Sequence, residues 1–476
     1  MRLGALRPRW RYPASAAFAV AFLGTLAVAM LQGEKPFLTD AAGYWQLGTT
    51  FTVNGHFSLL NYSDPLKGYG WPLILYGLQT MASDFAWTAS SVVKLFSVFT
   101  FALIGGVLGP ELIRAVWPSQ PRWGIARRLA LTALLIVFWS GFLNTPLSDF
   151  PTLTAALLTL VAVARTDSPG WMLVAGAALA LTINIRESYV PFAPGVVALV
   201  AWTWYEQRHS PHASTLRRAL CVVLFVLGFA AVSLPQSLSA HRHHGTWSFI
   251  PGATVPEPPG VFWGAGLGLQ GYDTYVINGE ARVEMRYVYP AGERLLKEQK
   301  EEKITSTGQY LGLFVSHPLV MVGLVVRNVV NGLDPLYSTA YIENLHNEGR
   351  TWGRIAGFLL LFAALLRLLW PAARRLLGSG RLRYLAVLLL GCVSTFPIGG
   401  NRRYLLPVYL LIYVLALTPR WPNPIAGNGE GLRRLRTPAV IGLAFVVYAA
   451  FVWYITSDAI NHLVIRDGVS REILHL

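Results

Sequence analysis

Long runs of apolar residues alternate with short polar connectors along most of this 476-residue chain. A run of about 20 apolar residues is long enough to cross the hydrocarbon core of a bilayer as a helix. The pattern therefore predicts an all-α, polytopic membrane protein with about eleven transmembrane helices. The predicted spans are 14–31, 88–113, 126–143, 150–165, 170–184, 190–205, 219–235, 351–370, 384–400, 404–419 and 438–456.

One further apolar segment, 318–333, is short for a span and contains Arg327, Asn328 and Asn331. Counting it as a crossing would move the later basic connector at 374–383 to the outside, against the positive-inside rule. We therefore expect an interfacial or re-entrant helix there. This leaves 236–350 as one small extracytoplasmic segment of mixed structure, with a solvated helix at 293–303 and irregular loop in its proline-rich and glycine-rich beginning.

The first outer loop, 32–87, is rich in aromatic residues, and we expect helices that lie along the membrane interface there. A short outer turn follows at 144–149. The chain then divides into three parts: an N-terminal transmembrane module at 1–235, the extracytoplasmic segment at 236–350, and C-terminal transmembrane helices at 351–476.

The charge pattern fixes an orientation for these spans. The formal net charge is +15, yet only 13% of residues are charged, and the arginines lie in small groups between apolar runs. Such grouping is typical of cytoplasmic connectors and forms no single patch, so nucleic acid is excluded as a partner. We expect a multi-pass protein of the inner or plasma membrane, with a cytoplasmic N-terminus and an uncleaved first span. The basic groups are Arg2 to Arg11, Arg114 to Arg128, Arg208 to Arg218, Arg374 to Arg383 and Arg433 to Arg436.

Cysteine and histidine offer little metal chemistry. Cys221 and Cys392 both fall inside apolar runs, which argues against a disulfide framework or a cysteine zinc site. His241, His243 and His244 match no standard zinc spacing, and a solvated patch is the simpler interpretation.

Two carboxylates stand at predicted outer ends of spans. Asp40 begins the run DAAGYWQLG beyond the first span, and Asp149 lies in NTPLSDFPTL before the fourth. A carboxylate beside the hydrocarbon boundary is costly and usually functional. The simpler alternative for each is a helix N-cap, whose side chain accepts from free backbone N–H groups. A cap would also fix the position of the carboxylate, so the two interpretations are compatible.

Four cations belong to the same predicted face: Lys67 in DPLKGYGWP, Arg186 in NIRESYVPF, and Arg402 and Arg403 in NRRYLLP. Each alone is explained by snorkelling to lipid headgroups, or for Arg186 by pairing with Glu187. Together they suggest an anion site, because the guanidinium fork matches phosphate. The nearby aromatic residues Tyr44, Trp45, Trp71 and Tyr76 suit either an interfacial belt or a platform for a sugar ring.

In their order, the motifs DAAGYW, KGYGWP, PLSDFPTL, NIRESYVPF and NRRYLLPVY resemble the GT-C superfamily of membrane glycosyltransferases. The similarity is to the branch of protein O-mannosyltransferases and aminoarabinose transferases. It covers roughly the first 200 residues and the stretch near 400, while 236–350 is unmatched. The resemblance implies transfer of a sugar, with inversion, from a polyprenyl-phosphate donor to a glycan, lipid or protein acceptor outside the cytoplasm.

The resemblance also implies roles for individual residues. Asp40 corresponds to the catalytic carboxylate and general base, and Asp149 to the second acidic residue. Four cations correspond to the donor phosphate site: Lys67, Arg186, Arg402 and Arg403. Tyr44, Tyr69 and Tyr404 correspond to aromatic residues of the substrate pocket. No cofactor is certain, and a divalent metal remains open.

Two other classes of function remain as alternatives. A flippase or another transporter of lipid-linked glycans would show paired halves with charges near the bilayer midplane. A glycan polymerase would carry its key arginines in the large external segment. Here the charges stand at the predicted outer face, and the ordered motifs begin at Asp40.

Overall fold

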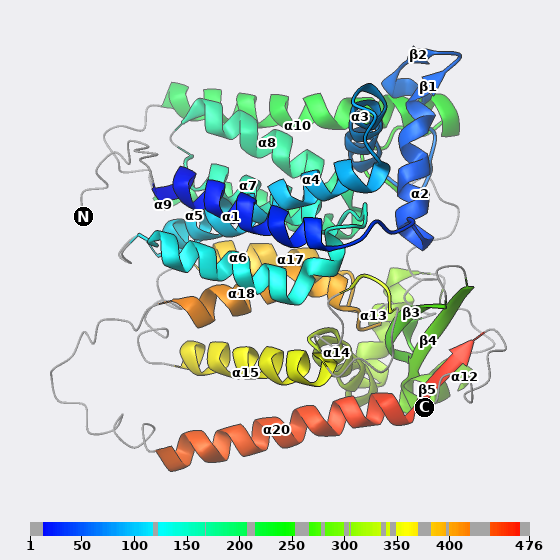
Figure 1. The fold of residues 1–476 in the computed structure, drawn as a ribbon, viewed down its shortest axis with the longest axis vertical. Coiled ribbons are helices and arrows are strands. Elements are labelled where there is room, and N and C mark those ends of the chain that lie inside the picture. Colours follow the sequence, from blue (N-terminus) through cyan, green and yellow to red (C-terminus); the bar gives the residue numbers. More distant parts are fainter. Residues whose placement is uncertain are drawn as a thin grey trace, which may run out of the picture. The chain divides into compact units, whose positions relative to one another are not determined.

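The computed structural model of the chain is mostly helical, with two small antiparallel sheets (Figure 1). This confirms the helical membrane architecture expected from the apolar runs. The described residues are 13–117, 122–166, 168–206, 215–252, 266–277, 281–298, 304, 306–334, 339–342, 349–369, 382–396, 399–418 and 438–466.

Among the described residues, five helical segments are long and apolar enough to cross a membrane alone, and each coincides with a predicted span. One of the five, Ala89–Val116, consists of two α-helices that a π-helical turn, η3 (Ile104–Leu108), joins into one continuous segment. The segments are α1 (Pro13–Leu31), α10 (Thr215–His244), α4 (Ala89–Leu103) with η3 and α5 (Gly109–Val116), α6 (Ile125–Trp139) with η4 (Ser140–Phe142), and α20 (Pro438–Asn461).

Helices also occupy the six other predicted spans, but they do not meet the same test of length and composition. A sixth candidate is the pair α13 (Thr307–Ser316) and α14 (Pro318–Gly332), which bends by 111° as a broken span or a re-entrant loop does. That bend agrees with the re-entrant alternative expected for 318–333. The helices in the six other predicted spans, which do not include α13 and α14, are α7 (Asp149–Val163), α8 (Pro169–Ile185), α9 (Phe192–Glu206), α15 (Gly349–Leu369), α17 (Arg383–Val393) and α18 (Leu406–Leu417).

The chain forms two compact units. Unit 1 contains Met1–Tyr62, Tyr69–Ile185 and Val200–Pro235. Unit 2 contains Ser63–Gly68, Arg186–Leu199 and Gln236–Leu476. The three-part division expected from the sequence shares the boundary after residue 235, whereas two short earlier segments, 63–68 and 186–199, belong to unit 2.

In unit 1, α1, α4 and α6 pack side by side around the π-turn (Figure 1). Gly105 and Gly106 make this close approach possible. A Cβ on Gly105 would overlap Thr132 of α6, and one on Gly106 would lie 3.2 Å from the Cα of Phe18 in α1. Small residues that let backbones approach are the usual basis of helix packing in membranes.

Helix α7 is the centre of unit 1 and is buried on nearly every side. It packs on α8, and α8 in turn meets α10 through a pair of glycines. A Cβ on Gly176 would overlap the carbonyl oxygen of Phe225, and one on Gly228 would overlap that of Leu173. The two helices therefore meet backbone to backbone.

The predicted outer ends of the unit 1 helices are joined by hydrogen bonds. Gln32 Nε2 donates to the carbonyl of Ser140 at 3.1 Å, and Lys94 Nζ donates to the carbonyl of Gln32 at 2.6 Å. Trp71 Nε1 donates to the carbonyl of Pro146 at 3.0 Å. The ends of α1, α4 and α6, the start of α3 and the 144–149 turn thus lie at one end of the unit.

The predicted cytoplasmic ends of unit 1 meet around one carboxylate. Glu111 lies 3.5 Å from Arg114, 3.5 Å from Arg128 and 3.7 Å from Arg165. Arg128 also donates to the carbonyl of Gly106 at 2.6 Å, inside the π-turn. These ion pairs join α5, α6 and the end of α7 at the end of the unit where the arginine-rich connectors lie.

The first outer loop contains the expected helices, α2 (Thr39–Leu47) and α3 (Gly70–Asp84), and also a small hairpin. Strands β1 (Thr52–Val53) and β2 (His56–Phe57) pair across Asn54 and Gly55, both with positive φ. Asn-Gly is a strong sequence signal for such a two-residue turn. Short 3₁₀ turns flank the hairpin, η1 (Gly48–Phe51) and η2 (Leu59–Asn61).

In unit 2 the second sheet has the order β3-β4-β5, all antiparallel. Its strands are β3 (Leu269–Ile277), β4 (Ala281–Val288) and β5 (Leu463–Arg466), so the last strand comes from beyond the final span. The sheet lies beside α12 (Pro290–Glu298), which covers the described part of the helix expected at 293–303 (Figure 1). Residues 299–303 and 253–265 of the predicted helix and loop lie outside the described residues.

Helix α18 is the buried centre of unit 2, as α7 is of unit 1. It packs against α15 and α17 and begins directly after a 3₁₀ turn, η7 (Arg402–Leu405). A second 3₁₀ turn, η5 (Glu187–Tyr189), packs on α17, where Ser394 Oγ donates to the carbonyl of Ser188 at 2.6 Å. Arg186 and the NRRYLLP motif are therefore both fixed to the helical core of unit 2.

Candidate functional site

Asp40 lies in the first turn of α2 in unit 1, and its side chain is exposed. The residue at the N-cap position is Leu38, so Asp40 is not the cap itself. Its carboxylate still benefits from the positive end of the helix dipole. The alternative interpretation of Asp40 as an N-cap is therefore incorrect.

The backbone immediately before Asp40 is strained. Thr39 has φ of 51°, a left-handed conformation that is an outlier for a β-branched residue. Its Oγ1 is buried and has no hydrogen-bond partner among the described residues. Strain of this kind persists only where surrounding structure enforces it, and it gathers at functional sites.

Asp149 is the first residue of α7 and is almost completely buried. The N-cap position is occupied by Ser148, so Asp149 is not the N-cap of its helix. Pro151 follows as the third residue, where a missing N–H costs the helix nothing. The sequence SDFP thus begins the helix and places the carboxylate in its first turn, at the positive end of the dipole.

The two carboxylate motifs meet in unit 1. Tyr44, four residues after Asp40 and on the same face of α2, receives a hydrogen bond from Ser148 Oγ at 3.4 Å. Ser148 directly precedes Asp149, and both oxygens of this bond are buried. Segments 104 residues apart, which carry the two predicted acids, are therefore in contact.

Tyr69 is a buried anchor of unit 1. Its hydroxyl donates to the carbonyl of Val232 in α10 at 2.7 Å, and burial raises the pKa of Tyr69 to about 12. The next residue, Gly70, donates its N–H to Asn184 Oδ1 at 2.6 Å. The predicted pocket aromatic thus joins the start of α3 to α8 and α10.

Arg186 and Tyr404 come together in unit 2. The guanidinium carbon of Arg186 lies 4.8 Å from the centre of the Tyr404 ring, within the range of a cation–π interaction. The Tyr404 hydroxyl in turn lies 2.7 Å from the hydroxyl of Tyr272 in β3. Arg186 is buried and sits in extended backbone between α8 and η5. Two predicted motifs 218 positions apart therefore share one contact.

The turn that carries Arg402 and Arg403 is fixed by its neighbours. Asn401 Oδ1 accepts from the N–H of Arg403 at 3.0 Å, and its Nδ2 donates to the carbonyl of Tyr272 at 3.2 Å. Gly400 lies against the backbone of α14, because a Cβ there would meet the carbonyl of Asn328 at 2.5 Å. The glycines of PIGGN thus let the loop approach α14 and β3.

Arg402 reaches away from this turn to the carbonyl of Thr339, which its Nη2 contacts at 2.6 Å. Burial lowers the pKa of the Arg402 guanidinium from its ordinary value, and the carboxylate of Asp273 opposes that shift. A guanidinium remains charged after such a shift. Arg402 is therefore a charged group held inside unit 2.

Lys67 belongs to unit 2, although it comes from the first outer loop. Its N–H and that of Leu66 donate to Asp64 Oδ1, at 2.6 and 2.9 Å. The segment is held by hydrogen bonds from the N–H of Gly252 to the carbonyl of Pro65, and between His244 Nε2 and the carbonyl of Ser63.

All four predicted cations lie in unit 2, and both predicted carboxylates lie in unit 1. Their meeting in one site stays a prediction.

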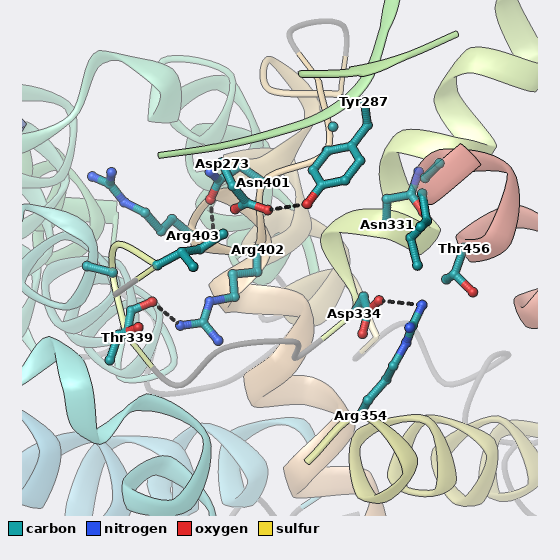
Figure 2. Close-up of a pocket in the computed structure, with 16 residues that line it drawn as sticks. Asp273, Tyr287, Asn331, Asp334, Thr339, Arg354, Asn401, Arg402, Arg403 and Thr456 are labelled. Atoms are coloured by element: carbon teal, nitrogen blue, oxygen red, sulfur yellow. Dashed lines mark hydrogen bonds and ion pairs between the residues drawn. The ribbon is translucent and has the colours of Figure 1, made fainter. Parts of the chain in front are cut away.

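A cavity of about 690 Å³, including its space open to solvent, lies beside Arg402 and Arg403 within unit 2 (Figure 2). Two ion-paired or hydrogen-bonded acids face it. Asp334 Oδ2 lies 2.9 Å from Arg354 Nη2, and Asp273 Oδ2 accepts from the Tyr287 hydroxyl at 3.3 Å. Its other polar lining residues include Asn331, Thr339, Asn401 and Thr456.

Sequence reasoning identified the two arginines of this cavity but missed its acids and amides. Asp273, Tyr287, Asn331 and Asp334 lie in the part of the chain that matched no family motif. The strands β3 and β4 were not predicted, and no local spacing shows that β3, the end of α14 and the start of α15 meet. Only the fold brings these segments together.

No group of three or more His, Cys, Asp or Glu side chains suited to a metal ion occurs among the described residues. His241 stacks on Trp247 with ring centres 4.3 Å apart, and His244 contacts the Ser63 carbonyl.

Comparison with known proteins gives no match: no protein-family model and no curated protein corresponds to this chain.

Proposed function

We propose that the protein is a GT-C-type glycosyltransferase with about eleven transmembrane helices. It would move a sugar, with inversion, from a polyprenyl-phosphate donor to an acceptor on the extracytoplasmic face. The multi-pass helical architecture and the ordered motifs support this proposal. A lipid donor explains why the enzyme is built into the membrane, since its chain needs an apolar environment and its phosphate needs cations at the interface.

The observation that carries the proposal is the contact between Tyr44 and Ser148 in unit 1. This contact brings the DAAGYW and PLSDFPTL segments together. Each segment begins a separate helix, so helix formation alone does not explain the contact. Catalytic sites typically combine residues from segments distant in the sequence, and these two segments each carry an acid. The strained, unsatisfied Thr39 beside Asp40 adds an independent sign of function.

Asp40 is the proposed general base. Its carboxylate would take the proton of the acceptor hydroxyl as the acceptor oxygen forms a bond to the anomeric carbon of the donor. The bond between that carbon and the phosphate oxygen breaks, and polyprenyl phosphate leaves with the electron pair. Asp149, held in the first turn of α7, would orient the acceptor or one of the cations.

Arg186, Arg403 and Lys67, with Arg402, would stabilise the leaving phosphate. Fixed donors aimed at developing negative charge typically contribute about 3 kcal/mol each to transition-state stabilisation. The stacking of Arg186 on Tyr404 supports this role, because it holds the guanidinium in a defined plane. Arg402 and Arg403 also stand at the start of α18, where the positive end of the helix dipole favours an anion.

The direct test replaces the proposed base while keeping its shape. Asp40→Asn should abolish sugar transfer from polyprenyl-phosphate-linked donors but leave the binding of polyprenyl phosphate intact. Transfer is followed by mass spectrometry of the lipid products, and binding by native mass spectrometry of the purified protein.

Asp84→Asn is the matched control, since Asp84 is an exposed carboxylate at the end of α3 in the same loop. This variant should retain full transfer. Near wild-type transfer by Asp40→Asn would remove Asp40 as the base. Failure of the wild-type protein to bind polyprenyl phosphate would remove the proposed donor class.

A further inference from the structure

The cavity of unit 2 has a lining suited to a hydroxyl-rich ligand. Its described residues supply carboxylates, amides, guanidiniums and a phenol, which together present acceptors and donors at short spacing. Figure 2 shows Asp273, Asn401 and Tyr287 on one side of the cavity, and Asp334 and Arg354 on another.

Asn331 supplies an acceptor that the protein itself does not use. Its Nδ2 donates to the carbonyl of Gln270 at 2.9 Å, which fixes the orientation of the amide. Its Oδ1 is buried and has no hydrogen-bond partner among the described residues. Buried acceptors are nearly always satisfied in folded proteins. A ligand hydroxyl in the cavity would complete this group.

The fixed geometry of the other groups favours a polyol over a simple anion. Asp334 is already paired with Arg354, and Asp273 accepts from Tyr287. Carboxylates that are held in place by a guanidinium or a phenol can still accept hydrogen bonds from ligand hydroxyls. Sugars offer adjacent hydroxyls that donate and accept at once, so each can bridge a carboxylate and a guanidinium.

The cavity is lined by residues from two parts of the chain, one that resembles a known family and one that does not. Arg402 and Arg403 come from a motif that resembles the donor site of GT-C enzymes, whereas Asp273 and Asn331 come from the unmatched segment. A transferase must hold its acceptor beside the phosphate of its donor. We infer that this cavity binds the acceptor as a sugar residue, with Asp273 and Asn331 as positioning residues. The role as acceptor rests on the proposed transferase.

Binding of monosaccharides to the full-length protein tests this inference without any donor. The probes are the methyl glycosides of glucose, galactose and mannose, and glucuronate. Saturation-transfer NMR is suited to weak ligands, and the detergent must lack a sugar headgroup. We expect at least one probe to bind. Asp273→Asn and Asn331→Ala should each weaken that binding about tenfold, the loss expected for one buried hydrogen bond.

Glu284→Gln is the control, because Glu284 lies on the neighbouring strand β4 but pairs with Arg286 outside the cavity. This variant should bind the glycoside as the wild type does. Asp273→Asn conserves shape, so it keeps the test valid even if Asn331→Ala loses its bond to Gln270 and unfolds. Absence of binding by every probe, or equal affinity in the wild type, Asp273→Asn and Glu284→Gln, would overturn the inference.

The same preparations are tested for binding of polyprenyl phosphate, which separates this inference from the proposed function. Glycoside binding that depends on Asp273, without polyprenyl-phosphate binding, would leave the sugar site standing and remove the proposed donor. Polyprenyl-phosphate binding without any glycoside binding would keep the donor and remove the sugar site.

Discussion

Helices α7 and α18 are both buried on nearly every side, each at the centre of its own unit. Each also begins at a motif picked out in the sequence and carries a proline in its first turn. Their N-termini differ in charge. Asp149 opens α7, where a carboxylate is favoured by the helix dipole, whereas Arg402 and Arg403 precede α18, where cations are disfavoured.

The acid at the start of α7 therefore stabilises its helix, whereas the arginines before α18 destabilise theirs. The acid of α7 is explained by helix electrostatics alone, so its role in catalysis needs separate evidence. The arginines before α18 stand against the dipole, and the carboxylate of Asp273 is one group that offsets the charge of Arg402. Residues that oppose local electrostatics are more informative about function than residues that agree with it.

The units also differ in what holds them together. Unit 1 relies on close backbone packing at glycines, with polar groups gathered at its two ends. Unit 2 has such a close approach at Gly400 and, in addition, an ion pair between helices far apart in the sequence, since Arg327 Nε and Asp458 Oδ2 lie 3.4 Å apart. Variants in both units test these differences.

Gly176→Ala should produce the largest loss of stability. The added Cβ would overlap the carbonyl oxygen of Phe225, and neither backbone can move without separating α8 from α10. We expect a loss of about 3 kcal/mol, the upper part of the range for overpacking. Thermal unfolding of the purified protein in detergent measures it. Gly170→Ala in the same helix has no atom within 4 Å of its Cβ and should be neutral or slightly stabilising. Equal melting of the two variants would contradict the backbone contact.

Asp458→Asn should weaken unit 2 by about 2 kcal/mol, below the cost of breaking a fully buried ion pair. The carboxylate accepts from Gln270 Nε2 at 3.1 Å as well as from Arg327, so one change affects α14, α20 and β3. Hydrogen exchange should show the loss in β3, β5 and α14 while the helices of unit 1 stay protected. Exchange that rises equally in both units would show that unit 2 does not depend on this link.

Asp149→Asn and Arg403→Gln should change stability in opposite directions, by about 0.5 kcal/mol each. Loss of the acid removes a favourable charge from the start of α7. Loss of the arginine removes an unfavourable one from the start of α18, and polyprenyl-phosphate binding should fall as stability rises. Melting temperatures and native mass spectrometry measure the two properties. A less stable Arg403→Gln protein with unchanged lipid binding would assign this arginine to structure alone.

The sequence predicted much of unit 1, because its signals are local. Apolar runs locate each helix, arginine groups orient them, and Asp40 and Asp149 stand at helix starts that their own sequences define. The Asn54-Gly55 hairpin was also readable from its turn signal, although the aromatic loop was expected to form only interfacial helices. The contact of Tyr44 with Ser148 was implied only by the shared side of the membrane.

Less of unit 2 could be predicted from the sequence, because its sheet and its cavity combine segments that are far apart in the chain. A helix that does not cross the membrane alone was expected at 318–333, but the helix α13 before it and the bend between the two were not predicted. The addition of β5 to the sheet was not predicted either, because strand pairing depends on which segments the fold brings together. Asp273, Asn331 and Asp334 carried no signal as site residues, since each is ordinary where it stands, in β3, in α14 and just after α14.

From the sequence alone one could predict a mostly helical protein with several long apolar helices, because hydrophobicity acts on each segment separately. The orientation of these helices, inferred from the arginine groups, stays a prediction. The tertiary structure alone decided that Arg186 stacks on Tyr404, and that a carboxylate of β3 faces the same cavity as an amide of α14. Contacts between distant segments depend on how buried surfaces fit, and no stretch of the chain contains that information alone.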